Sequence, residues 1–267
     1  MENETFTQEI VYQWQKTWSA KNLEKSIENC GHDKILLPFF MKYLSKDGPS
    51  LECGCGLGQW VVYLGKLGYP MAGIDIVPEC VRICKEYYPH GDVREGDVRH
   101  LPFPDRYFTG YISIGVFEHM IEGPETTMRE MGRVLKPGGI AIILVPSFNY
   151  FMQIWYPVRK IIVDILRNNQ LLRRLLGKTA YSGNQTNFKN KFEDIKKCVR
   201  SDYWPIIGTD PQKGPLFIEY KCKKNQIPDL LKSMDFQIIE SVPIHHPFIF
   251  GDVFGTIFFA NNGDDSM

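Results

Sequence analysis

The chain of 267 residues lacks the features that mark membrane-spanning, secreted and nucleic-acid-binding proteins. None of its apolar runs reaches the roughly 18 residues that a membrane-spanning helix needs. Its first ten residues are polar and acidic, without the basic and apolar stretches of a signal peptide. Its formal net charge is zero, so the molecule as a whole has no electrostatic preference for nucleic acid. We therefore expect a cytoplasmic protein for which nucleic acid is not the partner.

Cysteine occurs seven times, yet we expect neither a disulfide framework nor a zinc site. An odd number of cysteines without a secretion signal argues against disulfide bonds. Only one residue separates Cys53 from Cys55, whereas paired zinc ligands usually have about two to four residues between them. We interpret the cysteines as small buried side chains.

The order of polar and apolar residues predicts an α/β fold. Between residues 48 and 147, short apolar runs alternate with helical patterns, which is typical of βαβ units. Residues 140–145 are wholly apolar, as expected for a strand in a sheet that helices cover on both faces. After residue 215 the pattern resumes, and we expect residues 236–243 and 255–260 to form an antiparallel pair. We predict an N-terminal helical cap (1–47), an α/β core (48–147), a basic, partly helical insertion or lid after the fifth strand (148–215), and a completion of the core (216–267).

A glycine-rich loop follows the first predicted strand. Residues 51–59 read LECGCGLGQ, with the pattern Glu-x-Gly-x-Gly-x-Gly between a strand and a helix. Glycines permit a sharp turn and let a ligand approach the backbone closely. A nicotinamide-binding loop has the spacing Gly-x-Gly-x-x-Gly and directs a helix N-terminus at a diphosphate. The carboxylate of Glu52 would repel a diphosphate, and it favours a ligand with an ammonium or sulfonium group.

Two further acidic residues follow the next two predicted strands. Asp75 ends the second strand, where its carboxylate can bind both hydroxyls of a ribose. Asp97 follows the third, where it can accept a hydrogen bond from an adenine amino group. The carboxyl ends of parallel strands meet at one sheet edge, so Glu52, Asp75 and Asp97 are expected to face one crevice. A single Asp is more commonly a turn or cap residue, so the prediction depends on all three together.

Residues 51–147 resemble the class I S-adenosylmethionine-dependent methyltransferases, in particular their broad small-molecule branch. Beyond the loop and the acids, the resemblance includes Gly96-Asp97-Val98, Phe117-Glu118-His119 and the stretch RVLKPGG at residues 133–139. A later likeness departs from the family at Asp235, where a glycine is usual.

The resemblance implies a Rossmann-like sheet of seven strands, mostly parallel with one antiparallel strand near the edge. It implies S-adenosylmethionine as the methyl donor and S-adenosylhomocysteine as the product. The cofactor-binding residues that it implies are Glu52, Gly54, Cys55, Gly56, Gly58, Gln59, Asp75, Ile76, Asp97, Val98, Ser113 and Ile114.

The candidate for acid–base chemistry is the pair Glu118 and His119. A hydroxyl acceptor needs a base, and His119 follows the fourth strand with an ordinary pKa near neutrality. A packing or cofactor-contact role fits the same position equally well. Some relatives hold a divalent ion with Glu-x-x-Glu-His, but Gly115 replaces the first acid here. Two ligands are too few for a tight site, so we expect no metal.

Residues 151–200 contain eleven Lys or Arg and three Asp or Glu, a surplus of eight positive charges. Part of this segment has apolar residues on one helical face, as an ordinary helix packed on the domain would. A helix lying peripherally on an anionic membrane, or a face that receives an acidic carrier or phosphorylated substrate, are the alternatives. The aromatic residues that we consider as a lining of the acceptor pocket are Tyr12, Trp14, Trp18, Tyr203 and Trp204, and core packing fits each of them equally well.

The sequence thus predicts an enzyme that transfers a methyl group to oxygen, nitrogen or carbon of a small-molecule or lipid-like acceptor. Such an in-line displacement requires donor and acceptor to be held close and aligned. Two other functions stay open. One is an NAD(P)-dependent reductase, which the glycine spacing disfavours, and the other is a non-catalytic S-adenosylmethionine-binding module. The pattern indicates neither the acceptor nor the oligomeric state.

Overall fold

The computed structural model describes residues 2–146, 158, 185–210, 213–223, 225–248 and 251–263. The predicted basic amphipathic helix, with its candidate membrane or carrier contact, therefore lies almost wholly outside the described residues. Within the described part of the chain, no helix is both long and apolar enough to cross a membrane. The four predicted regions stay a prediction, and strand β7 (Gly214–Lys221) crosses the predicted boundary between residues 215 and 216.

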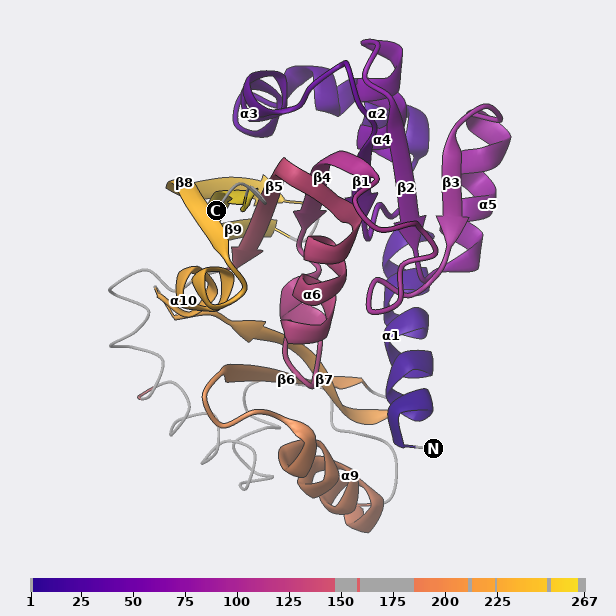
Figure 1. Cartoon of the computed structure of the whole chain (residues 1–267). Helices are drawn as coiled ribbons and strands as arrows, with labels where there is room; N and C mark the ends of the chain where they lie inside the picture. The colour runs from indigo at the N-terminus through magenta and orange to yellow at the C-terminus, as the bar shows by residue number, and fades with distance from the viewer. Residues whose placement is uncertain are drawn as a thin grey trace.

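A seven-stranded sheet forms the centre of the molecule, in the order β3-β2-β1-β4-β5-β9-β8 (Figure 1). Strands β1 to β5 pair in parallel, whereas β9 runs antiparallel to both β5 and β8. This confirms the predicted sheet with one antiparallel strand near its edge. The strands are β1 (Ser50–Cys53), β2 (Met71–Asp75), β3 (Asp92–Glu95), β4 (Phe108–Ile114), β5 (Leu135–Pro146), β8 (Phe236–Phe248) and β9 (Gly251–Asn262).

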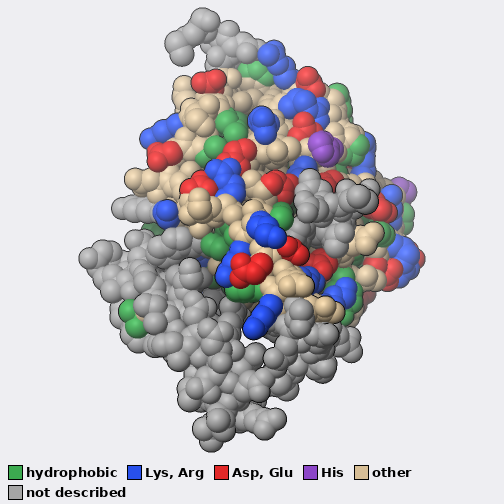
Figure 2. Space-filling view, turned by 90° about the horizontal axis from the view of Figure 1, so that it is seen from below, with side chains coloured by type: hydrophobic (Ala, Val, Ile, Leu, Met, Phe, Trp, Pro, Cys, Tyr) green, Lys and Arg blue, Asp and Glu red, His purple; other side chains and the backbone are tan. Residues whose placement is uncertain are grey.

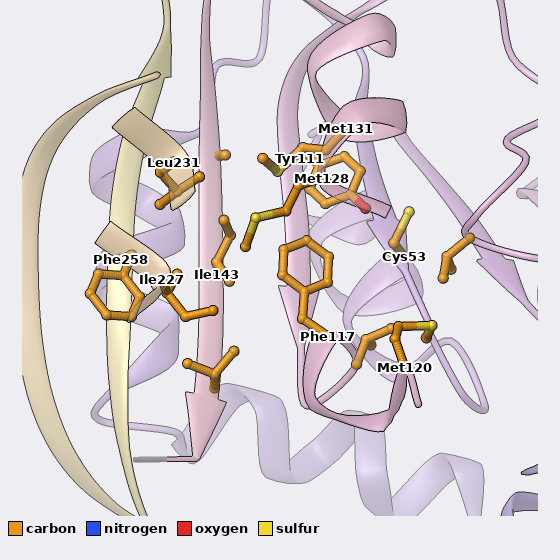
Figure 3. Packing of buried hydrophobic residues seen from close by; sticks show 14 of the residues in the cluster. Cys53, Tyr111, Phe117, Met120, Met128, Met131, Ile143, Ile227, Leu231 and Phe258 are labelled. Carbon is orange, nitrogen blue, oxygen red and sulfur yellow. The ribbon is translucent and has the colours of Figure 1, made fainter. Parts of the chain in front are cut away.

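Helices cover both faces of this sheet because successive residues of each strand point to opposite sides (Figure 1). On one side Tyr111 and Ile143 pack with residues of α6 and α10, and Phe117 and Met128 fill the same layer (Figure 3). The helices are α1 (Glu2–Trp18), α2 (Leu23–His32), α3 (Leu36–Tyr43), α4 (Gln59–Lys66), α5 (Pro78–Tyr87), the 3-10 turn η1 (Phe117–His119), α6 (Glu125–Val134), α9 (Gln185–Cys198) and α10 (Gln226–Ser233).

The opposite face of the sheet is covered in part by the N-terminal helices. Ile112 and Ile142, the strand neighbours of the residues above, pack there against Phe40 of α3 and Trp60 of α4. The side chain of Asn22 caps α2 by accepting a hydrogen bond of 2.9 Å from the amide of Lys25. Loss of such a cap costs about 1 kcal/mol. The predicted helical cap is thus partly a layer of the core rather than a detached lid.

A separate two-stranded hairpin, β6 (Trp204–Asp210) and β7 (Gly214–Lys221), lies beside η1 and α1 (Figure 1). Residues 217–221 therefore pair with β6. The resumed α/β pattern had suggested that they join the central sheet, which they do not. Tyr220 anchors the hairpin, because its hydroxyl donates a 2.5 Å hydrogen bond to the carbonyl of Ile121. It also accepts one of 2.8 Å from the amide of Arg200.

The departure from the family pattern at Asp235 has a backbone consequence. This residue follows α10 with φ at +64°, in the left-handed region that glycine adopts at little cost. Asp tolerates this conformation better than most residues, which explains how the turn into β8 survives the substitution.

Candidate functional site

A cavity of about 1020 Å³ opens at the carboxyl ends of the central strands. Its walls come from the loops after β1, β2, β3 and β4, from α1 and α2, and from the end of β7. Ligand pockets commonly measure about 300–1,000 Å³, so this one is large enough for a cofactor together with a second molecule.

The glycine loop after β1 has the close approach to neighbouring elements that its sequence predicted. The loop glycines Gly54, Gly56 and Gly58 all have positive φ, between +56° and +76°. A Cβ atom on Gly54 would lie 2.4 Å from a methyl group of Val116, and one on Gly56 would lie 2.3 Å from the Trp18 ring. The loop therefore needs glycine both for its backbone conformation and for space.

Asp75 fastens this loop to the end of β2. Its Oδ2 accepts a 2.7 Å hydrogen bond from the amide of Gly56, and its Oδ1 accepts one of 2.9 Å from the amide of Val77. Burial raises the pKa of Asp75, and the hydrogen bonds from Val77 and Gly56 offset part of that rise. Each oxygen retains a lone pair, so the carboxylate can still accept hydrogen bonds from the hydroxyls of a bound ribose.

Glu52 is 3% exposed, and its Oε2 has no hydrogen-bond partner among the described residues. Burial raises the pKa of Glu52 to about 8, and the negative charge of Asp75 adds a smaller contribution in the same direction. A buried carboxyl oxygen without a partner costs free energy, and a cationic ligand would satisfy it. The glycine cradle, this carboxyl and Asp75 together fit the amino-acid and ribose parts of S-adenosylmethionine.

The carboxylate of Asp97 already has a hydrogen-bond partner within the protein. It accepts hydrogen bonds from the side chain of Arg99 at 2.6 to 3.0 Å and from the amide of Arg99 at 2.8 Å. Burial alone would raise the pKa of Asp97, but the hydrogen bonds and charge of Arg99 hold it below its usual value. An adenine amino group would therefore share a carboxylate that Arg99 keeps ionised and oriented.

The structure brings two-thirds of the predicted cofactor residues to one surface. Those on the cavity wall are Glu52, Gly54, Gln59, Asp75, Ile76, Asp97, Val98 and Ile114. The cavity lining does not include Cys55, Gly56, Gly58 or Ser113. Cys55 is buried in the apolar cluster behind the loop, and Ser113 is fully buried in β4. A Cβ on Gly58 would meet the sulfur of Cys84 at 2.3 Å, so this glycine, like Gly56, makes room for a neighbouring side chain.

The aromatic residues of α1 divide according to helical phase. Trp14 and Trp18, four residues apart, face the cavity and stack with ring centroids 6.4 Å apart. Tyr12 does not line the cavity, because its ring lies under the amino group of Lys213 at 3.5 Å. Tyr203 is 4% exposed and packs against Tyr220, which corresponds to the alternative of core packing. Trp204 begins β6, and its predicted place in the pocket stays a prediction because its side chain lies outside what the structure describes.

One part of the cavity wall, around His119, is polar. The Nδ1 atom of His119 lies 2.6 Å from the carbonyl oxygen of Ile218. A carbonyl only accepts, so Nδ1 carries the hydrogen and Nε2 keeps its lone pair. Burial lowers the pKa of His119, which favours the neutral ring. Trp14 packs edge-on against this ring, with centroids 4.8 Å apart.

Three charged or ionisable side chains surround His119. Glu118 is 3% exposed, its Oε2 has no partner in the described part of the chain, and burial raises the pKa of Glu118 to about 8. Glu219 and Lys221 come from β7 and form an ion pair of 2.5 Å. The sequence analysis missed both as site residues, although residues 219 and 221 of one strand necessarily share a face.

Comparisons with known proteins agree with this geometry. Residues 51–143 match the family described as methyltransferase domain. The uncharacterized methyltransferase YodH of Bacillus subtilis is 32% identical over 102 residues, which cover 37% of this chain and 43% of that protein. The demethylmenaquinone methyltransferase of Chlorobaculum tepidum is 34% identical over 100 residues, or 36% of this chain and 40% of that one. The chain thus spans less than half the length of these two curated relatives.

Solved structures extend the likeness of the fold over most of the chain. A methyltransferase from Methanosarcina mazei, described as S-adenosylmethionine-dependent, has a TM-score of 0.61 at 18% identity, covering 85% of this chain and 98% of that one. The 1,6-didemethyltoxoflavin-N1-methyltransferase of Burkholderia thailandensis, solved with bound 1,6-didemethyltoxoflavin and S-adenosylhomocysteine, has a TM-score of 0.57 at 12% identity. It covers 98% of this chain and 89% of that one.

Proposed function

Because this chain belongs to the class I S-adenosylmethionine-dependent methyltransferases, we propose that it methylates a small-molecule or lipid-like acceptor. When bound, S-adenosylmethionine supplies an electrophilic methyl group on a sulfonium. The observation that carries the proposal is the convergence of Glu52, Asp75 and Asp97, from the ends of three neighbouring strands, on one cavity.

Different residues of the cavity would bind different parts of the cofactor. Glu52 would pair with the ammonium group, because its buried carboxyl needs a cationic or donating partner. Asp75 would hold the ribose hydroxyls, and Asp97 with the apolar side chain of Val98 would hold the adenine. The protein's task is then to hold an acceptor atom in line with the methyl group.

The acceptor end of the cavity supports an amphiphilic molecule. Trp14 and Trp18 form an aromatic part of the wall, and Glu118, His119 and Glu219 form a polar part. A molecule with an apolar body and a polar head matches this order of surfaces. That some relatives are named demethylmenaquinone methyltransferases supports the lipid-like form of the proposal. The role of His119 as base stays a prediction, which the lone pair on Nε2 supports because Nδ1 donates to the carbonyl of Ile218.

The described part of the basic segment adds little to a membrane contact. In α9, Lys196 and Lys197 pair with Glu193 and Asp194. Figure 2 shows Lys or Arg beside Asp or Glu over the described part of that face, without a patch of one sign. A peripheral contact with anionic lipid would therefore depend on residues 151–184. Sedimentation with anionic vesicles at low salt tests it, and protein that stays in the supernatant would contradict it.

The cofactor assignment is tested by titration calorimetry with S-adenosylmethionine. We expect micromolar binding that Asp75→Ala weakens at least tenfold, about 1.4 kcal/mol. The matched control is Glu95→Gln, because Glu95 is the neighbour of Asp75 in register at the end of β3 but is exposed outside the cavity. Equal affinities for all three proteins, or binding of NADPH instead, would overturn the assignment. Turnover with candidate acceptors then separates an enzyme from a binding module.

A further inference from the structure

We propose that Glu118, His119 and Glu219, in the polar part of the cavity wall, form a binding site for one divalent metal ion. Each side chain offers one ligand atom, and these atoms lie within 4.8 Å of one another. Two carboxylates and one imidazole suit ions such as Mn²⁺ and Zn²⁺. The site itself stands on geometry, and only its placement beside an acceptor rests on the proposed function.

The ring of His119 is held as a metal-binding histidine requires. Its Nδ1–H donates to the carbonyl of Ile218 at 2.6 Å, and this bond leaves Nε2 as the free ligand atom. A backbone carbonyl commonly fixes metal-bound histidines in this way. Trp14 supports the ring from the side, with its centroid 4.8 Å away.

Glu118 provides an independent sign that something is bound here. Its side chain is 3% exposed, and its Oε2 lacks a partner among the described residues. Its Oε1 lies 3.9 Å from the Nε2 atom of His119. One ion with ligand bonds of about 2.0–2.2 Å bridges such a separation. An ion bound through both carboxyl oxygens of Glu118 would also give the unpaired Oε2 a partner and so relieve its cost.

The third ligand comes from a different part of the chain. Glu219 directly follows Ile218, whose carbonyl fixes His119. Two adjacent residues of β7 therefore orient the imidazole ring and provide the third metal ligand. Lys221 pairs with Oε1 of Glu219 at 2.5 Å, which leaves the other oxygen for an ion. In the metal-free protein Lys221 supplies the compensating positive charge, and with an ion bound it would repel that ion.

A bound ion would change the chemistry expected of this part of the cavity. It would attract oxygen atoms of the acceptor, and it would lower the pKa of a hydroxyl bound to it. Nε2 of His119 would then be a ligand and could not also be the base.

The test uses the full chain, stripped of metal with a chelator. Mn²⁺ is titrated by electron paramagnetic resonance and Zn²⁺ by calorimetry. We expect one ion per chain with a Kd below about 100 μM, a free energy of binding of about 5.5 kcal/mol or more. Glu118→Gln and Glu219→Gln should each weaken binding at least tenfold, and Lys221→Met should tighten it about threefold. Glu122→Gln is the control, because Glu122 lines the same cavity but bonds to Arg99 outside the cluster.

Glu219 is only partly buried, so its variant reports on the site even if Glu118→Gln folds poorly. The proposal is overturned if neither ion saturates one site per chain, or if the Glu118, Glu219 and Glu122 variants bind as the wild type does. Titration of the same samples with S-adenosylmethionine separates the two proposals. Cofactor binding without metal binding removes the metal site alone, whereas metal binding without cofactor binding removes the proposed function alone.

Discussion

The two walls of the cavity are built from the chain in opposite ways. The cofactor wall consists of the loops after β1, β2, β3 and β4, from Glu52 to Ile114. The acceptor wall joins α1 to the end of β7, where Gln13 Nε2 donates to the carbonyl of Phe217 at 3.5 Å across 204 residues of sequence. Local turn chemistry determines the first wall, and long-range packing determines the second. Variants in each wall should therefore have separable effects.

The largest effect is expected where the two walls touch. Gly56→Ala would place Cβ 2.3 Å from the Trp18 ring at a φ of +56°. The left-handed backbone costs roughly 1–2 kcal/mol and the overpacking roughly 1–3 kcal/mol. We expect the free energy of unfolding to fall by about 3 kcal/mol, and the affinity for S-adenosylmethionine to fall with it. Urea unfolding and calorimetry measure the two losses.

Gly138→Ala is the control for this variant. Gly138 has a φ of +76°, but a Cβ there would meet nothing within 4 Å. Only the backbone cost of roughly 1–2 kcal/mol should then appear, with no change in cofactor affinity. If both alanine variants lost the same free energy of unfolding, close packing of Trp18 on Gly56 would not hold the two walls together.

A smaller effect, confined to the cofactor wall, should follow pH. The pKa of Glu52 in the ligand-free protein is raised to about 8, so below that pH the carboxyl is protonated. Pairing with an ammonium group needs the ionised form, so binding releases one proton. The affinity for S-adenosylmethionine should therefore rise about tenfold per unit from roughly pH 6 until the ammonium group of the ligand, with an ordinary pKa of about 7.7–8.0, begins to lose its own proton.

Glu52→Gln should remove this slope and weaken binding at pH 8 by about tenfold, or 1.4 kcal/mol. Calorimetry at several pH values measures both. A wild-type affinity that stays constant from pH 6 to 8 would show that Glu52 does not pair with the cofactor.

The smallest effect is expected at the outer edge of the acceptor wall. Glu9 of α1 pairs with Lys191 of α9, and both side chains are partly exposed. Partly exposed ion pairs contribute about 0.2–1 kcal/mol, so Glu9→Gln should lower the free energy of unfolding by that amount at low salt. Cofactor affinity should not change. Hydrogen exchange of α1 should quicken, and added salt should erase the difference between variant and wild type.

The same contrast explains what could be predicted. The sheet, the glycine loop and the acids at the strand ends could be predicted, because each depends on a pattern of residues only two to four positions apart. The structure brings Glu52, Asp75 and Asp97 to one cavity. Tyr12 and Tyr203 could not be placed, because an aromatic residue serves a core and a pocket equally well. Glu219 could not be predicted as a site residue, because nothing local says that its strand pairs with β6 outside the central sheet and lies beside η1.

The strand order has a consequence for the order in which the chain acquires structure. Strands β1 to β5 all lie before residue 147, so this parallel group can assemble while the remainder is still being synthesised. Its β5 strand, apolar from Ile140 to Val145, would meanwhile be an unpaired edge until β9 arrives more than a hundred residues later. Such an edge is prone to pairing with other chains. Nascent chains stalled between residues 150 and 250 should therefore aggregate or recruit chaperones more than the full-length protein does.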